Sequence, residues 1–350
     1  MGISILIFFI KALYSAEAGT KSFRLNNHLG QWLTTEALIV QHLNSYFRDM
    51  YTATPTDHVQ IVLDFIDLLV TNEMNASLMA TISLEEVKAA VFELGALKAP
   101  DPDGFSGSFY QTYWNIIKED NILVAQELFH HPKLLKSGTE GEFALKLDMN
   151  KAYDRVDWNF LEMVLFKLGF HHTWVRLVMN CVTSTSMTLL INGSPGRKFR
   201  PTRGLRQCDQ LSPFLFLFIN DVLSTMIRKI YNAGLLDAIK LNTNDPLVSH
   251  LFFADDSIFF LKATLSNCEV LSDTIHQYCC ASGQSINKQK STLFFSHNTQ
   301  PEIVHLISSV LDMKSVPNLG HYLGLPTVWG RSKLSALAYV KENILQKITC

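Results

Sequence analysis

The residues best suited to chemistry in this sequence are two adjacent aspartates, Asp255 and Asp256, inside the apolar and aromatic stretch His250–Leu261. Apolar residues on both sides of a short polar interruption predict a strand, a tight turn and a second strand. Two ionised carboxylates beside a core are costly unless a cation or hydrogen-bond donors compensate their charge. Asp is also a common turn residue, so a solvent-facing turn without chemistry is the alternative interpretation.

A third carboxylate, Asp148, ends another predicted strand. Within Glu142–Met149, Phe143, Leu145 and Leu147 alternate with smaller or charged residues, which places Asp148 on the face opposite the apolar side chains. Three carboxylates from two strands could hold one or two Mg²⁺ ions, which prefer oxygen ligands and keep positions open for phosphates. Two such ions promote an in-line displacement at phosphorus.

Positive charge is concentrated in one short stretch, although the whole chain has a formal net charge of −2. In a chain of this overall charge, a nucleic-acid partner needs such a local cluster of positive charge to bind to. A solvated basic strand is the alternative interpretation. The cations of this stretch are Arg197, Lys198, Arg200, Arg203 and Arg206.

Composition limits the class of protein. The 350 residues, 47% hydrophobic and 18% charged, describe a globular chain with a sizeable core. The six cysteines show no zinc-finger spacing, so we expect reduced thiols in an intracellular protein. The apolar run Gly2–Ile10 has no basic residue before it and is too short to span a bilayer, so it predicts a buried strand or helix, not a signal peptide or membrane anchor.

Hydrophobic spacing predicts a series of helices and strands. We expect helices over Thr34–Tyr51, Asp57–Leu69, from Ser83 onward, Ser108–Ile117, Asn159–Leu168, Leu211–Tyr231, Ser266–Ser282, Pro301–Leu311 and Lys333–Ile348. We expect further strands over Met187–Asn192, from Lys198 onward, Thr292–Phe295 and Tyr322–Pro326.

Several short motifs occur together and in one order. The set resembles the reverse transcriptase of non-LTR (LINE-type) retrotransposons, of the kind abundant in plant genomes, from about Thr34 to the C-terminus. Each motif alone is weak, and the set is specific. The motifs are Lys98–Pro100 with Pro102–Gly104, Leu147–Trp158, Gly204–Gln207 with Leu211–Pro213, Phe253–Asp256, Ser282–Asn287 and Tyr322–Pro326.

The resemblance implies an α+β fold, the right-hand polymerase palm, in which helices back an antiparallel sheet. It further implies incomplete fingers and a truncated thumb. The implied organisation is an N-terminal helical region over 1–82, a pre-palm and fingers remnant over 83–120, the palm over 121–296, and the primer grip with the start of the thumb over 297–350.

The resemblance also implies a role for each matching residue. Asp148, Asp255 and Asp256 would be the catalytic carboxylates and would hold two Mg²⁺ ions, with Mn²⁺ able to replace them. Tyr153 would be a steric gate under the sugar of the incoming nucleotide. The other nucleotide-binding residues would be Arg206, Gln207 and Lys290. The residues expected to bind nucleic acid are Arg197, Lys198, Arg200, Arg203, Tyr322 and Gly324.

The sequence departs from the family pattern in several places. Cys208 and Gln210 replace a glycine and a proline, Asp101 replaces another glycine, and a basic fingers segment is missing between Asp120 and Asn121. The prediction is an RNA-directed DNA polymerase that uses two-metal nucleotidyl transfer on an RNA template, a DNA primer and dNTPs, with no protein partner evident. The alternative is a catalytically inactive retroelement remnant with at most weak nucleic-acid binding. A hydrolase that uses the same carboxylates is a third option, but no substrate-pocket motif supports it.

Overall fold

The computed structural model describes residues 5–9, 25–27, 30–80, 141–191, 194–207, 209, 211–239, 248–253, 256–318, 321–322 and 325–326. The strands are β1 (Ile5–Phe9), β2 (Leu25–Asn26), β3 (Trp32–Leu33), β4 (Glu142–Asp148), β5 (Ser186–Ile191), β6 (Ser194–Pro195), β7 (His250–Phe253), β8 (Asp256–Lys262), β9 (Thr292–Phe295), β10 (Lys314–Ser315), β11 (His321–Tyr322) and β12 (Leu325–Pro326). The helices are α1 (Glu36–Met50), α2 (Val59–Leu63), α3 (Asn72–Leu78), α6 (Ala152–Arg155), α7 (Trp158–Leu168), α8 (His172–Thr183), α9 (Leu211–Asn232), α10 (Leu265–Ser282) and α11 (Pro301–Leu311).

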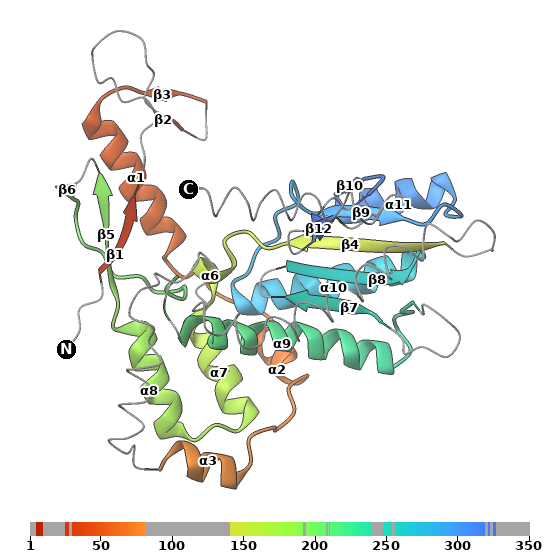
Figure 1. Cartoon of the computed structure of the whole chain (residues 1–350), viewed down its shortest axis with the longest axis horizontal. Coiled ribbons are helices and arrows are strands. Elements are labelled where there is room, and N and C mark those ends of the chain that lie inside the picture. Colours follow the sequence, from red (N-terminus) through yellow and green to blue (C-terminus); the bar gives the residue numbers. More distant parts are fainter. Residues whose placement is uncertain are drawn as a thin grey trace, which may run out of the picture.

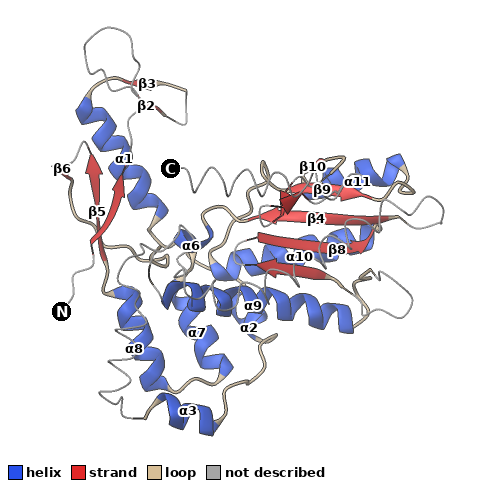
Figure 2. Ribbon diagram, viewed as in Figure 1, coloured by secondary structure: helices blue, strands red, loops and turns tan. Residues whose placement is uncertain are grey.

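The centre of the fold is a five-stranded sheet in the order β10–β9–β4–β8–β7 (Figure 1). Every neighbouring pair is antiparallel except β10 and β9, which run parallel. Helices lie along one side of this sheet (Figure 2). This arrangement confirms the α+β class and the antiparallel sheet backed by helices.

The two faces of the sheet carry different cores because alternate residues of a strand point to opposite faces. In β4, Phe143, Leu145 and Leu147 join the main core, which includes residues of α7, α9 and α10. Ala144, between them, belongs to a smaller cluster on the other face with Phe260. The predicted alternation of this strand is therefore confirmed.

Helix α9 is the longest described helix and confirms the prediction for Leu211–Tyr231 to within one residue. Asp209 accepts a hydrogen bond from the N–H of Leu211 at the start of the helix (2.9 Å). Among the described helices, α9 alone has the length and composition to cross a membrane, and 61% of its apolar window is buried in the fold. Its hydrophobicity is thus explained by its place under the sheet, as expected of a core helix.

A smaller group of elements projects from one end of the central sheet. It comprises α1, the β2–β3 hairpin and the β1–β5–β6 sheet (Figure 1). Ile39 and Leu43 of α1 form its core with Leu189 of β5. The N-terminal apolar run contains β1, which pairs parallel with β5, so the strand interpretation of this run is confirmed.

Three segments differ from the sequence prediction. The helix expected over Asp57–Leu69 ends at Leu63. Farther along, the N–H groups of Leu69 and Val70 both donate to the carbonyl of Leu168 at the end of α7. The return strand expected from Lys198 is limited to β6 and one isolated bridge to Phe199. In place of one strand over 322–326, β11 and β12 form a short antiparallel pair.

Helices α3, α6 and α8 were not predicted. The four cysteines among the described residues are free thiols. Other predictions fall outside the described residues: the helices at Ser83, Ser108–Ile117 and Lys333–Ile348, the loop around Asp101, the Asp120–Asn121 junction, and Cys208, Gln210, Asp255 and Gly324.

Candidate active site

Asp148 and Asp256 lie opposite each other at the adjoining ends of the two central strands. Asp148 is the last residue of β4, Asp256 is the first of β8, and the ladder pairs them directly. Residues paired in this way on antiparallel strands project from the same face of the sheet. Both residues are partly exposed, so the pair presents two carboxylates at one edge of the fold.

The third predicted carboxylate, Asp255, falls between β7 and β8, outside the described residues. Within the described part of the chain, no group of three His, Cys, Asp or Glu side chains is placed to hold a metal ion. The structure therefore brings two of the three predicted ligands together and does not test the third.

The backbone of Asp148 is held by a segment far along the chain. Its N–H donates to the hydroxyl of Ser291 (3.0 Å), and its carbonyl accepts from the N–H of Asn287 (2.8 Å). The Ser291 hydroxyl is buried and donates in turn to the carbonyl of Asn287 (2.9 Å). Next to it, the N–H of Asn150 donates to the carbonyl of Ser285 (2.7 Å). These bonds use the backbone of Asp148, so its carboxylate is not needed to fix the strand end.

Two glycines allow distant segments to approach α6, the short helix that follows β4. Gly204 has a φ of 94°, and a Cβ there would lie 2.7 Å from the carbonyl oxygen of Asp154. Gly283 has a φ of 76°, and a Cβ there would lie 2.7 Å from the carbonyl oxygen of Arg155. Both the left-handed backbone and the close approach require glycine. Two of the sequence motifs thus serve to clamp α6 in place.

Tyr153, the predicted steric gate, is on α6. Its ring stacks on Phe216 of α9 with 4.5 Å between centroids and 17° between planes. Its carbonyl accepts a hydrogen bond from the N–H of Leu205 (2.8 Å). The ring is partly buried and is fixed from α9, as a rigid wall would need to be. Its role toward a nucleotide stays a prediction.

Asp154, next to Tyr153, received no functional role from the sequence. Its carboxylate is buried and accepts hydrogen bonds from the Tyr51 hydroxyl (2.8 Å) and from the side-chain amide of Gln207 (3.2 Å). Burial raises the pKa of the Asp154 carboxyl above its ordinary value, and the bond from Tyr51 opposes that rise. Burial and the nearby carboxylate also raise the pKa of Tyr51. Gln207, a predicted nucleotide contact, thus uses one amide N–H for a hydrogen bond within the fold. Its side chain also carries a carbonyl oxygen and a second N–H.

The predicted nucleic-acid-binding cations between residues 197 and 203 include both exposed and buried side chains. Arg197, Lys198 and Arg200 are exposed, as the prediction requires. Arg203 is only 4% exposed and donates to the carbonyl of Met50 (2.8 Å), in the last turn of α1, where carbonyls lack helical partners. Burial lowers the pKa of its guanidinium. The expectation that Arg203 belongs to an exposed basic surface is therefore corrected, because it holds α1 instead.

The other predicted contact residues lie around this edge. Arg206 forms an ion pair with Asp209 (3.2 Å), just before α9. Lys290 is exposed and directly precedes Ser291, which bonds to Asp148. The backbone of Tyr322 lies in β11, and Gly324 is outside the described residues.

Sequence reasoning missed Tyr51, Asp154 and Ser291 as residues that build the site. Tyr51 and Asp154 are 103 residues apart, and Ser291 is 143 residues from Asp148. No spacing rule connects residues at such separations. The available signal was Asp154 itself, a charged residue in a motif otherwise assigned to metal and nucleotide binding.

The comparisons with known proteins agree with this geometry. Residues 111–326 match the family described as reverse transcriptase (RNA-dependent DNA polymerase). Since the match covers more than half of the chain, this protein belongs to the reverse transcriptase family. The central sheet and its helices are accordingly the palm of a polymerase.

Similar curated proteins indicate which kind of reverse transcriptase this chain resembles. The chain is 27% identical over 233 residues to a Pol polyprotein from the type-1 retrotransposable element R2 of Popillia japonica, which covers 58% of this chain and 32% of the relative. It is 28% identical to an uncharacterized protein of transposon TX1 from Xenopus laevis, over 49% of this chain and 12% of the relative. An uncharacterized mitochondrial protein of Arabidopsis thaliana is 44% identical over 71 residues, or 20% of this chain and 58% of the relative.

The chain therefore spans between 12% and 58% of the length of these relatives. It is a reverse transcriptase of the non-LTR retrotransposon kind, and the resemblance seen in the sequence is confirmed. Among solved structures, apo telomerase from Candida tropicalis, truncated from its C-terminal domain, is similar with a TM-score of 0.39 at 15% identity, over 64% of this chain and 46% of that chain.

Proposed function

We propose that this chain catalyses RNA-directed DNA synthesis, in which the 3′-hydroxyl of a DNA primer attacks the α-phosphate of a dNTP paired to an RNA template and pyrophosphate leaves. The observation that supports this activity is the direct pairing of Asp148 with Asp256 at the open ends of β4 and β8, inside the region that matches the family. Paired carboxylates on one face of a palm sheet are suited to hold hard cations against a triphosphate.

The metal ligands of this proposal are Asp148, Asp255 and Asp256. Asp148 and Asp256 fit the requirement for oxygen donors, because they lie on one face and are partly exposed. The intended ions are two Mg²⁺, with Mn²⁺ as a replacement. When bound, the ions stabilise charge on the attacking and leaving oxygens of the displacement.

The remaining residues would orient the substrates. Tyr153, stacked on Phe216, would lie under the sugar of the dNTP and exclude a 2′-hydroxyl. The residues proposed to contact the nucleotide are Arg206, Gln207 and Lys290. Those proposed to bind template and primer are Arg197, Lys198, Arg200, Tyr322 and Gly324.

The test is primer extension on an RNA template with Mg²⁺ and dNTPs. The purified chain should extend the primer, and Asp255→Asn and Asp148→Asn should each abolish extension. Asp273→Asn serves as the matched control, because Asp273 is an exposed carboxylate on α10. Loss of extension in this control, or extension that survives both active-site changes, would contradict the assignment.

A second candidate function is nucleic-acid binding without synthesis. Its support is the exposed trio Arg197, Lys198 and Arg200, together with the fingers segment that the sequence lacks at Asp120–Asn121. In that case no primer extension is seen at any metal or template concentration, while a primer–template duplex still binds with an affinity that falls as salt rises. Binding without extension would favour this remnant over the polymerase.

A further inference from the structure

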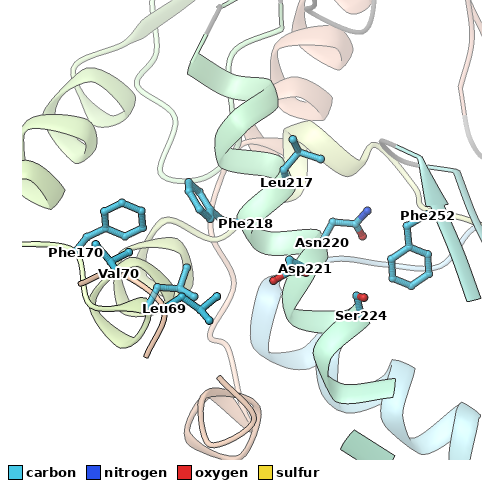
Figure 3. A pocket seen from close by; sticks show the side chains of 10 residues that line it. Leu69, Val70, Phe170, Leu217, Phe218, Asn220, Asp221, Ser224 and Phe252 are labelled. Atoms are coloured by element: carbon cyan, nitrogen blue, oxygen red, sulfur yellow. The ribbon is translucent and has the colours of Figure 1, made fainter. Parts of the chain in front are cut away.

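An open groove lies along α9, and its cavity has a volume of about 420 Å³. On α9 it is lined by Leu217, Asp221 and Ser224, whose spacing of three to four residues places them on one face of the helix. Figure 3 shows these side chains between Phe170, which follows α7, and Phe252 of β7. None of the lining residues belongs to the proposed polymerase site, so the α9 groove has no role in that function.

One wall of the α9 groove is tied firmly to the rest of the fold. The N–H groups of Leu69 and Val70 donate to the carbonyl of Leu168 at the end of α7 (3.0 and 2.9 Å). Next to them, the ring of Phe170 lies edge-on to that of Phe218 on α9, with 5.4 Å between centroids. A preformed wall needs little ordering when a partner binds, which lowers the entropic cost of association.

Large apolar side chains are exposed both in the α9 groove and next to it. Within the groove, Leu69 is 60% exposed and Leu217 is 44% exposed. Beyond it, Leu68 is 76% exposed, and Phe214, one turn before Leu217 on α9, is 49% exposed. A small molecule that filled the cavity would leave the last two side chains in water. Exposed apolar surface of this extent is typical of a contact with another protein.

Asp221 gives this apolar groove a negative charge. Its carboxylate is exposed and lines the cavity. Within the described part of the chain, no ion pair includes Asp221, because Lys167 of α7 and Lys229 of α9 pair instead with Asp64 and Asp67. Charge complementarity therefore favours a partner that carries a cation among apolar residues, and it disfavours the phosphates of a nucleic acid.

The dimensions of the α9 groove fit a helix. Leu217 and Ser224 are seven residues apart, which is about 10 Å along the axis of α9. Two apolar residues seven positions apart on a partner helix have the same separation, and a residue midway between them on the same face would lie opposite Asp221.

We propose that the α9 groove binds an amphipathic helix of a partner protein, with two apolar anchors seven residues apart and a Lys or Arg between them. The anchors would fill the cavity, and the cation would pair with Asp221. This interaction goes beyond the proposed polymerase function and does not depend on it.

The test uses a fluorescein-labelled, alanine-based helical peptide as the probe, with fluorescence anisotropy of its binding to the whole chain as the readout. The peptide carries a phenylalanine and a leucine seven residues apart and a lysine four residues after the first of them. Replacement of its lysine by glutamine should weaken binding roughly fivefold, the upper range for an exposed ion pair. Anchors placed five residues apart should weaken it roughly tenfold, because they then lie on different faces of the helix.

Two protein variants test the same contacts from the other side. Leu217→Arg should weaken binding of the lysine peptide roughly tenfold, because it removes an apolar contact within the groove. Asp221→Lys should reverse the charge preference, so that a peptide with glutamate in place of its lysine binds better than the lysine peptide. Leu235→Arg is the matched control, because Leu235 is also exposed (58%) but does not line the groove.

Several outcomes would overturn the proposal. These are no saturable binding of the lysine peptide to the wild-type chain, equal weakening in Leu235→Arg and Leu217→Arg, or a charge preference that persists in Asp221→Lys. A wild-type chain that dimerises in sedimentation, and that Leu217→Arg makes monomeric, would assign the groove to a second copy instead. The peptide series leaves the protein unchanged, so it tests spacing and charge even where a variant folds poorly.

Discussion

Two carboxylates of one motif are held in opposite ways. Asp148, at the open end of β4, is fixed through its backbone by Asn287 and Ser291, and its side chain is partly exposed. Asp154, on α6, is buried and is fixed through its side chain by Tyr51 and Gln207. The first region is the strand edge, and the second is the junction of α1, α6 and the segment before α9.

The difference separates residues that build the site from residues that are available to a ligand. At the junction, burial makes every polar side chain depend on a protein partner, since an unpaired buried group costs about 1–3 kcal/mol. At the strand edge, backbone hydrogen bonds fix Asp148, so its carboxylate is not required to hold the strand end. The predictions below perturb the strand edge, the junction and the basic stretch that adjoins the junction.

The largest effect is expected at the strand edge. Asp148→Asn should lower the rate of primer extension by roughly a thousandfold, because it removes a charge proposed to hold metal. The free energy of unfolding should change by less than about 0.5 kcal/mol, because the bonds that fix the strand end use the backbone. Denaturant melts beside single-turnover kinetics measure both. A large loss of stability would show that the edge, like the junction, depends on its side chain.

A smaller effect, on stability, is expected at the junction. Gly204→Ala should cost about 3 kcal/mol, since the new methyl group would meet the backbone of Asp154 and the left-handed φ adds strain. Gly234→Ala is the matched control, because Gly234 has a φ of 73° but nothing within 4 Å of an added Cβ. It should cost only about 1 kcal/mol. Equal losses in the two variants would mean that the close approach to α6 contributes nothing.

The buried carboxylate of Asp154 should affect how the stability of the fold depends on pH. A raised pKa means that folded Asp154 binds its proton more tightly than the unfolded chain does, so this group's contribution to stability falls as pH rises past its ordinary pKa. Asp154→Asn should therefore gain stability relative to the wild type, on the order of 1 kcal/mol, between about pH 4 and pH 8. Thermal melts across this range measure the difference.

Tyr51→Phe provides the opposite perturbation of the same group. Removal of the Tyr51 hydroxyl takes away the bond that opposes the rise in the pKa of Asp154, so the loss of stability should extend to higher pH. A pH profile that is identical in Tyr51→Phe and the wild type would show that the Asp154 carboxyl does not titrate in this range.

The smallest effect concerns the divided basic run. Arg200→Ala should reduce the slope of log Kd for a primer–template duplex against log salt by about 1, because one exposed cation is lost. Arg203→Ala should leave that slope unchanged and should instead lower stability by about 2 kcal/mol, because it leaves the end of α1 without its donor. A filter-binding titration over several salt concentrations distinguishes the two. A reduced slope in Arg203→Ala would indicate that Arg203 does contact the nucleic acid.

Much of the central sheet could be predicted from local patterns. The alternation in Glu142–Asp148 predicted β4, and the apolar flanks of Asp255 and Asp256 predicted β7 and β8. Period-3.6 spacing predicted α7, α9 and α10 within one residue at each end. These elements are long and have one clear buried face, so local sequence determines them. Motif order then brought Asp148 and Asp256 to one site.

Other features depend on partners that local sequence does not contain. Arg203 and Arg200 are equivalent in a count of charge, yet Arg203 is buried because the end of α1 lies against it, 153 residues away in the chain. The segment predicted to be helical up to Leu69 instead bonds through the N–H groups of Leu69 and Val70 to the carbonyl of Leu168 in α7. In both cases the hydrogen-bond partner is distant in the sequence.

The hydrogen bonds from Asn287 and Ser291 to the backbone of Asp148 also have a consequence for synthesis of the protein on the ribosome. Ser291 and Asn287 emerge long after Asp148, from which Ser291 is separated by 143 residues. At common rates of translation, Asp148 stays without these hydrogen-bond partners in the nascent chain for on the order of ten seconds. The strand end that carries Asp148 is therefore completed only after the chain has been synthesised as far as Ser291.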